Sequence, residues 1–188
     1  MSRLRFIAPL LVLEALLAVV GLTWATTAGF PLWPEVPWWA FIYATGATLA
    51  LLLVLEAAGE ALVGKSLQSL ERLEDQMARQ LRSQGVGLAQ ASLLALAAGI
   101  GEELFFRAAL FPFLSGHLGL VHAALLQALL FALMHPVPDR QAWAYPVWAF
   151  IAALVFVIPY QVTQSPLAGV LAHAIYDLRG FYQMYRRA

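Results

Sequence analysis

No charged side chain interrupts residues 36–55, which read VPWWAFIYATGATLALLLVL. This run matches the roughly 20 apolar residues that an α-helix needs to cross the hydrocarbon core of a bilayer. Further apolar stretches lie on both sides of it, at residues 6–24, 86–114, 118–134, 141–161 and 166–185. We therefore expect an all-α polytopic membrane protein with about six transmembrane helices.

The composition agrees with a membrane protein. Of the 188 residues, 62% are hydrophobic and only 12% are charged, whereas an ordinary soluble domain carries about 25% charged residues. These values exclude a soluble globular domain, a disordered chain and a nucleic-acid-binding protein. The chain contains no cysteine, which excludes disulfides, thiolate catalysis and cysteine-based metal sites.

The basic residues indicate the orientation in the membrane. With an even number of spans and both termini in the cytoplasm, the expected outer loops at about residues 25–35, 115–117 and 162–165 contain no Lys or Arg. The N-terminal run is also similar to a secretory signal, but its length and Glu14 favour a span. All basic residues except Arg107 then fall on the inner side, namely Arg3, Arg5, Lys65, Arg72, Arg79, Arg82, Arg140, Arg179, Arg186 and Arg187.

Residues 65–84 differ in kind from the spans. Leucines and a methionine recur at helical spacing, and charged residues fill the other faces, so we expect one interfacial amphipathic helix. We interpret it as a connector, with a dimerisation or partner helix as the alternative. The chain is then a single membrane domain, residues 1–188, made of two N-terminal spans (1–62), this helix, and a four-span core (86–188) that carries the candidate motifs.

Ionisable residues occur within or at the ends of the last four spans. A charge at the bilayer centre costs about 2.5–3.5 kcal/mol on insertion scales, so such residues are candidates for function. Glu103 and Arg107 are four positions apart and share a helix face, whereas Glu102 points about 100° away. We expect Arg107 to neutralise Glu103 and leave Glu102 facing the bundle interior. The candidate site residues are Glu102, Glu103, Arg107, His135, His173 and Asp177.

The remaining candidates lie on two other helices. His173 and Asp177 are four positions apart, and His135 continues a stripe that contains Gln127 and Phe131. Three helices therefore each present one polar face. If these faces meet, they enclose a cavity that contains water.

These residues form three motifs in order: E-E-x-x-x-R at residues 102–107, F-x-x-x-H at 131–135, and H-x-x-x-D at 173–177. Their order and separation resemble the CPBP family of intramembrane endopeptidases, which includes type II CAAX prenyl proteases and bacteriocin-processing or self-immunity proteins. The resemblance covers about residues 86–180. The family more often ends its last motif with Asn. An ionised Asp177 cannot donate a hydrogen bond to an oxyanion as Asn can. The alternatives are that Asp177 is protonated, that it orients His173, or that it binds a cation.

The resemblance implies hydrolysis of a peptide bond in a membrane-associated peptide or protein. Our hypothesis is that Glu102 is the general base, that His135 holds the same water, and that His173 with Asp177 faces the oxyanion. A metal variant uses His135, His173 and a carboxylate of Glu102 or Glu103 as a His₂Glu site for a divalent metal such as zinc. We favour the metal-free form.

Other interpretations use the same residues. A non-catalytic membrane adaptor or bacteriocin-immunity-type protein keeps the helices and tolerates loss of Glu102. A small transporter ranks below it, because no repeat symmetry is visible. The expected partners are the lipid bilayer and a peptide or membrane-protein substrate, with no nucleic acid. The expected location, from the resemblance, is a bacterial inner membrane.

Overall fold

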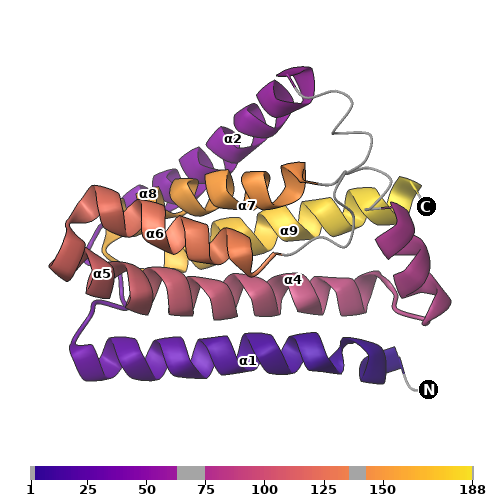
Figure 1. Ribbon diagram of the computed structural model, residues 1–188, viewed down its shortest axis with the longest axis horizontal. Helices are drawn as coiled ribbons and strands as arrows, with labels where there is room; N and C mark the ends of the chain where they lie inside the picture. Colours follow the sequence, from indigo (N-terminus) through magenta and orange to yellow (C-terminus); the bar gives the residue numbers. More distant parts are fainter. Residues whose placement is uncertain (1–2, 63–74, 136–142, 188) are drawn as a thin grey trace.

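The computed structural model describes residues 3–62, 75–135 and 143–187, and every regular element within these ranges is helical. The expectation of an all-α membrane protein is therefore confirmed. The segments are α1 (Arg3–Ala28), α2 (Trp38–Leu62), α4 (Leu88–Glu102), η1 (Glu103–Leu110), α5 (Phe111–Leu118), α6 (Leu120–Leu133), α7 (Ala144–Val155), α8 (Val157–Thr163) and α9 (Leu167–Arg187). Figure 1 shows their arrangement.

Three segments in the described ranges are long and apolar enough to cross a membrane: Ile7–Ala28, Trp38–Gly59 and Ala144–Thr163. They coincide with three of the expected spans. A shorter apolar helix, Leu120–Leu133, falls on a fourth. The total of about six spans stays a prediction, as does the division of the chain into two spans, a connector and a four-span core.

Three segments follow one another without a break. α4 passes into η1 and then α5, so that one continuous rod runs from Leu88 to Leu118 (Figure 1). The loop expected at residues 115–117 is wrong, because these residues are still helical. The chain turns instead at Gly119, whose φ of 75° lies in the left-handed region that glycine adopts without strain.

Small side chains fill the contacts between helices, while large apolar ones face outward. Lipid tails are as apolar as leucine, so helices in a bilayer associate by close packing of small residues rather than by hiding leucines. Leu16, Val19, Val54 and Leu133 are accordingly more than half exposed. The fully buried alanines among the described residues are Ala25, Ala78, Ala91, Ala95, Ala108, Ala109, Ala123, Ala128, Ala153, Ala168 and Ala172.

Glycines bring α1 against the rod. A Cβ atom at Gly21 would lie 2.4 Å from the carbonyl carbon of Leu104, and one at Gly101 would lie 2.5 Å from the carbonyl oxygen of Glu14. Only glycine permits these approaches, so α1 and the rod lie side by side along their length (Figure 1). This contact places Glu14 next to the start of η1.

The expected amphipathic helix is helical at residues 75–83, and residues 65–74 lie outside the described residues. Its Leu81 packs in a cluster with Ile7, Val86 and Leu94. Arg82 donates a hydrogen bond to the carbonyl oxygen of Tyr185, near the end of α9. The two ends of the chain lie at this same end of the bundle, whereas the C-terminal end of α2 lies apart from the other helices (Figure 1).

Candidate active site

The structure brings all six candidate residues together. Glu102 ends α4, and Glu103 and Arg107 lie on η1. His135 lies just beyond the end of α6, and α9 supplies His173 and Asp177. Three separate parts of the chain therefore meet at one place. The distances between their side chains indicate what they can do.

The Glu102 carboxylate lies between two imidazoles. Its Oε1 is 3.8 Å from His135 Nε2, and its Oε2 is 3.6 Å from His173 Nε2. The side chain of Glu102 is about nine-tenths buried, and its Oε2 has no hydrogen-bond partner among the described residues. A water molecule often bridges two polar atoms at such a distance by forming a hydrogen bond with each.

The other nitrogen of each imidazole is occupied. His135 Nδ1 lies 2.8 Å from the carbonyl oxygen of Phe131, and His173 Nδ1 lies 3.0 Å from Glu103 Oε1. Both oxygens are acceptors, so each Nδ1 carries a proton and donates it. Each ring also stacks on a phenyl ring at 4.6 Å, His135 on Phe131 and His173 on Phe156. These contacts fix both rings with Nε2 toward Glu102.

Glu103 lies behind this group and is paired with Arg107, as their four-residue spacing predicts. Its Oε1 is 3.0 Å from Arg107 Nη1, and both side chains are fully buried. Arg107 also donates to the carbonyl oxygen of Ala153 at 3.2 Å, and its guanidinium lies 4.8 Å from the ring centre of Phe131. Glu103 thus connects the buried cation to His173.

A glycine on α9 leaves space for the carboxylate of Glu103. A Cβ atom at Gly169 would lie 2.6 Å from Glu103 Oε2, closer than any side chain tolerates. The small residue therefore lets α9 approach the carboxylate that holds His173. The sequence motifs gave no indication of this contact.

The segment that carries Glu103 and Arg107 is a π-helix rather than an α-helix. Such wide turns inside α-helices are frequent at functional sites. Sequence spacing predicted that Glu103 and Glu102 diverge by about 100°, as on an α-helix. In the structure, Glu103 pairs with Arg107 and Glu102 lines the cavity, while the two adjacent carboxylates contact the two nitrogens of one ring, His173.

Asp177 lies on the same side of His173 as Glu102. Its Oδ2 is 3.7 Å from His173 Nε2, and its side chain is 30% exposed. His173 is therefore surrounded by the carboxylates of Glu102, Glu103 and Asp177. Such surroundings favour an imidazolium that donates from both nitrogens.

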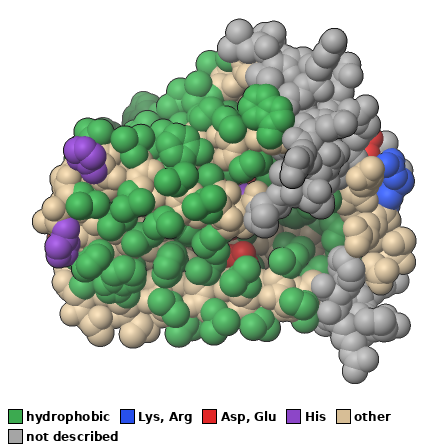
Figure 2. Space-filling view, viewed as in Figure 1, with side chains coloured by type: hydrophobic (Ala, Val, Ile, Leu, Met, Phe, Trp, Pro, Cys, Tyr) green, Lys and Arg blue, Asp and Glu red, His purple; other side chains and the backbone are tan. Residues whose placement is uncertain are grey.

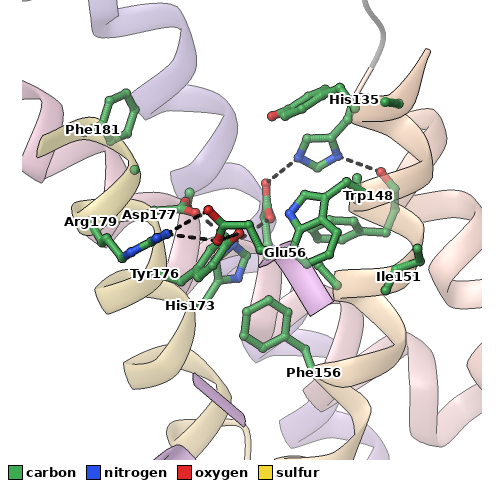
Figure 3. Close-up of a pocket in the computed structure, with 18 of the residues that line it drawn as sticks. Glu56, His135, Trp148, Ile151, Phe156, His173, Tyr176, Asp177, Arg179 and Phe181 are labelled. Carbon is green, nitrogen blue, oxygen red and sulfur yellow. Dashed lines mark hydrogen bonds and ion pairs between the residues drawn. The ribbon is translucent and has the colours of Figure 1, made fainter. Parts of the chain in front are cut away.

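Glu102, His135, His173 and Asp177 line a cavity of about 930 Å³ whose walls come from α1, α2, α4, α6, α7 and α9. Figure 3 shows His135, His173 and Asp177 on this wall, with Trp148 and Phe156 beside them. On the face drawn in Figure 2, hydrophobic side chains cover most of the described surface, and an acidic side chain is visible between them. The cavity is thus lined by both apolar side chains and charged groups.

Part of the cavity wall was missed from the sequence. Arg179 Nη1 donates to both oxygens of Glu56, at 3.1 and 2.9 Å, and the Tyr176 hydroxyl donates to Glu56 at 2.8 Å (Figure 3). This contact joins α2 to α9. Glu14 of α1 also lines the cavity. No motif links these residues, which are far apart in the sequence.

In the described part of the chain, no group of three or more His, Asp or Glu side chains is placed to hold a metal ion. The expected His₂Glu site stays a prediction, and we assign no step to a metal. His117 and His122 line a separate pocket and do not reach this site.

The comparisons with known proteins agree with these motifs. A family model described as type II CAAX prenyl endopeptidase, Rce1-like, matches residues 84–179, which include all six candidate residues. No curated protein and no solved structure matches the chain. The matched region is half of the chain and carries the three converging motifs. The chain belongs to the Rce1-like family of type II CAAX prenyl endopeptidases.

Proposed function

We propose that the protein is an intramembrane endopeptidase in which Glu102 activates a water molecule. The observation that carries this proposal is the position of the Glu102 carboxylate between His135 Nε2 and His173 Nε2, on the wall of the cavity. A water beside these atoms donates one hydrogen to Glu102 and the other to His135. Its oxygen then points toward a peptide carbonyl in the cavity.

The first step is attack by this water. Its oxygen forms a bond to the carbonyl carbon, Glu102 takes the proton, and the carbonyl oxygen becomes an oxyanion. His173, as an imidazolium, donates from Nε2 to that oxyanion. Glu102 next passes its proton to the leaving nitrogen as the C–N bond breaks, and the carboxylate is restored.

Glu103, Arg107 and Asp177 are positioning residues in this scheme. Glu103 accepts a hydrogen bond from His173 Nδ1 at 3.0 Å and is itself neutralised by Arg107. Asp177 balances the charge of the imidazolium from the cavity side. Since an ionised Asp cannot donate, His173 is the oxyanion donor that this site offers.

The substrate we propose is a membrane-associated peptide or protein, and the family name points to a lipid-modified C-terminal segment. Apolar side chains of the cavity wall, among them Leu94, Val147 and Ile151, suit a lipid chain or an apolar peptide segment.

We further propose that both termini face the cytoplasm of a bacterial inner membrane. The chain ends lie at one end of the bundle, where Arg82 contacts Tyr185 and Arg186 lies 5.8 Å from the Tyr182 ring. This grouping of basic residues agrees with the positive-inside rule.

The test is cleavage by protein purified in detergent. The probes are an internally quenched peptide with a prenylated cysteine beside the scissile bond and the same peptide without the prenyl group. We expect His135→Ala to lower kcat by about 10²-fold, since it loses the group that orients the water. His122→Ala, at the other end of α6, is the matched control and retains wild-type activity. Equal activity of His135→Ala and wild type contradicts the proposal.

Asp177 favours a second candidate function, a non-catalytic adaptor on the same scaffold, because it removes the amide donor of the usual motif. An adaptor of this kind cleaves neither peptide and keeps its cellular activity when Glu102 is replaced by Gln. Peptide cleavage that depends on Glu102 excludes it.

A further inference from the structure

Glu14 brings a carboxylate to the site from outside the region that the family model matches. It lies on α1, within the membrane-spanning segment Ile7–Ala28. Its side chain lines the same cavity as Glu102 and His173. The scheme proposed above gives it no role, although a charge at this depth costs about 2.5–3.5 kcal/mol on insertion scales.

The position of Glu14 is fixed by close packing. A Cβ atom at Gly101 would lie 2.8 Å from Glu14 Oε2, so the carboxylate rests against the residue that precedes Glu102. It is close enough to interact electrostatically with Glu102, His173 and Asp177. Glu14 is therefore part of the wall next to the reacting groups.

Among the described residues, Glu14 forms no ion pair with a Lys or Arg side chain. Its Oε2 is buried without a hydrogen-bond partner among the described residues. The described guanidinium groups of the cavity and its surroundings contact other groups: Arg107 pairs with Glu103, Arg179 pairs with Glu56, and Arg186 lies over the Tyr182 ring. A carboxylate in an apolar wall is stabilised by an opposite charge, which a ligand can supply.

The neighbouring wall suits a long cationic side chain. Leu10, one helical turn before Glu14, lines the cavity, and so do Leu94 and Ala98 of α4. Lysine and arginine bury an apolar stem while their charged end seeks an acceptor. A stem along this apolar wall brings the charged end to Glu14.

We propose that Glu14 determines specificity by binding a lysine or arginine side chain of the substrate close to the scissile bond. This inference rests on the proposed function for the reaction but concerns binding. It can therefore be measured without catalysis.

The experiment uses the full-length Glu102→Gln protein in detergent and fluorescent, N-acetylated, prenylated peptides. In each pair, one position within about four residues of the scissile bond is lysine or norleucine, which has the same stem without the charge. We expect the lysine peptide of one pair to bind about tenfold more tightly, as a charge-assisted hydrogen bond predicts. Adding Glu14→Gln abolishes this difference.

Glu56→Gln in the same background is the matched control. It removes a second carboxylate of the same cavity that Arg179 already neutralises, so the preference for lysine persists. Equal binding of lysine and norleucine peptides in every pair overturns the inference, and so does a preference that survives Glu14→Gln. If the preference for lysine is found but wild-type protein cleaves no peptide, the inference holds and the proposed reaction is wrong.

Discussion

His173 Nε2 lies 3.6 Å from Glu102 Oε2, although 70 residues separate the two in the sequence. The contact joins the end of α4 to the N-terminal third of α9, and Phe156 stacks on the same imidazole. Glu103 contacts the other nitrogen of the His173 ring and is itself paired with Arg107, and the side chains of Glu103 and Arg107 are fully buried. The site is therefore a preorganised polar cluster inside an apolar bundle, and its supporting contacts can be tested separately.

Arg107 is expected to stabilise the fold by neutralising Glu103. Arg107→Met removes one partner of a buried ion pair, a change that destabilises a protein by about 3–5 kcal/mol. We expect a lower midpoint of thermal unfolding, followed by tryptophan fluorescence in detergent. The double variant Glu103→Gln/Arg107→Met, which removes both charges, is expected to unfold at a higher temperature than Arg107→Met alone. An unchanged midpoint for Arg107→Met contradicts this role.

Gly169 is expected to be required for the position of Glu103. Gly169→Ala places a Cβ atom 2.6 Å from Glu103 Oε2, and overpacking of this kind costs about 1–3 kcal/mol. We expect a lower unfolding midpoint and slower cleavage. Gly180→Ala is the control on the same helix, since a Cβ atom there meets nothing within 4 Å. It is expected to keep or raise the midpoint, because alanine favours helix by about 1 kcal/mol. Equal midpoints for the two variants refute the explanation.

Asp177 tests the assignment of the oxyanion donor. Asp177→Asn introduces an amide donor next to His173 Nε2, so we expect kcat to rise by up to about tenfold. Asp177→Leu removes the charge without adding a donor and is expected to lower kcat. Both rates are measured with the prenylated peptide. Loss of activity in Asp177→Asn shows instead that the carboxylate itself takes part in the reaction.

The proposed scheme assigns no step to a metal ion, so a chelator is expected to leave kcat unchanged. The measurement compares cleavage before and after dialysis against 1,10-phenanthroline and EDTA. Loss of activity that one divalent ion restores contradicts the metal-free scheme. That ion would then be held by some of the three side chains around the proposed water.

Helical spacing predicted much of this site from the sequence. The four-residue intervals that relate Glu103 to Arg107 and His173 to Asp177 place each pair on one face, and both pairs are in contact in the structure. The apolar runs likewise predicted the helices that carry them. Residues on one face of a helix recur at a regular interval, so such a face can be recognised from the sequence.

Contacts between distant helices leave no such repeat. Glu56 pairs with Arg179 across 123 positions, and no motif indicates this contact. The π-helix at Glu103–Leu110 was also missed. The turn expected near Gly116 lies at Gly119. Either glycine could end a helix, and the packing of α6 decides which of the two does.

The most direct test of the account compares two glutamates of one cavity by replacing each with glutamine. Glu102→Gln keeps the shape but cannot take a proton from water, and we predict that kcat falls by about 10²–10⁴-fold with peptide binding retained. Glu56→Gln breaks a half-exposed ion pair, which is worth about 0–1 kcal/mol, and is predicted to stay close to wild type. A Glu102→Gln protein that cleaves the prenylated peptide as fast as Glu56→Gln contradicts the account.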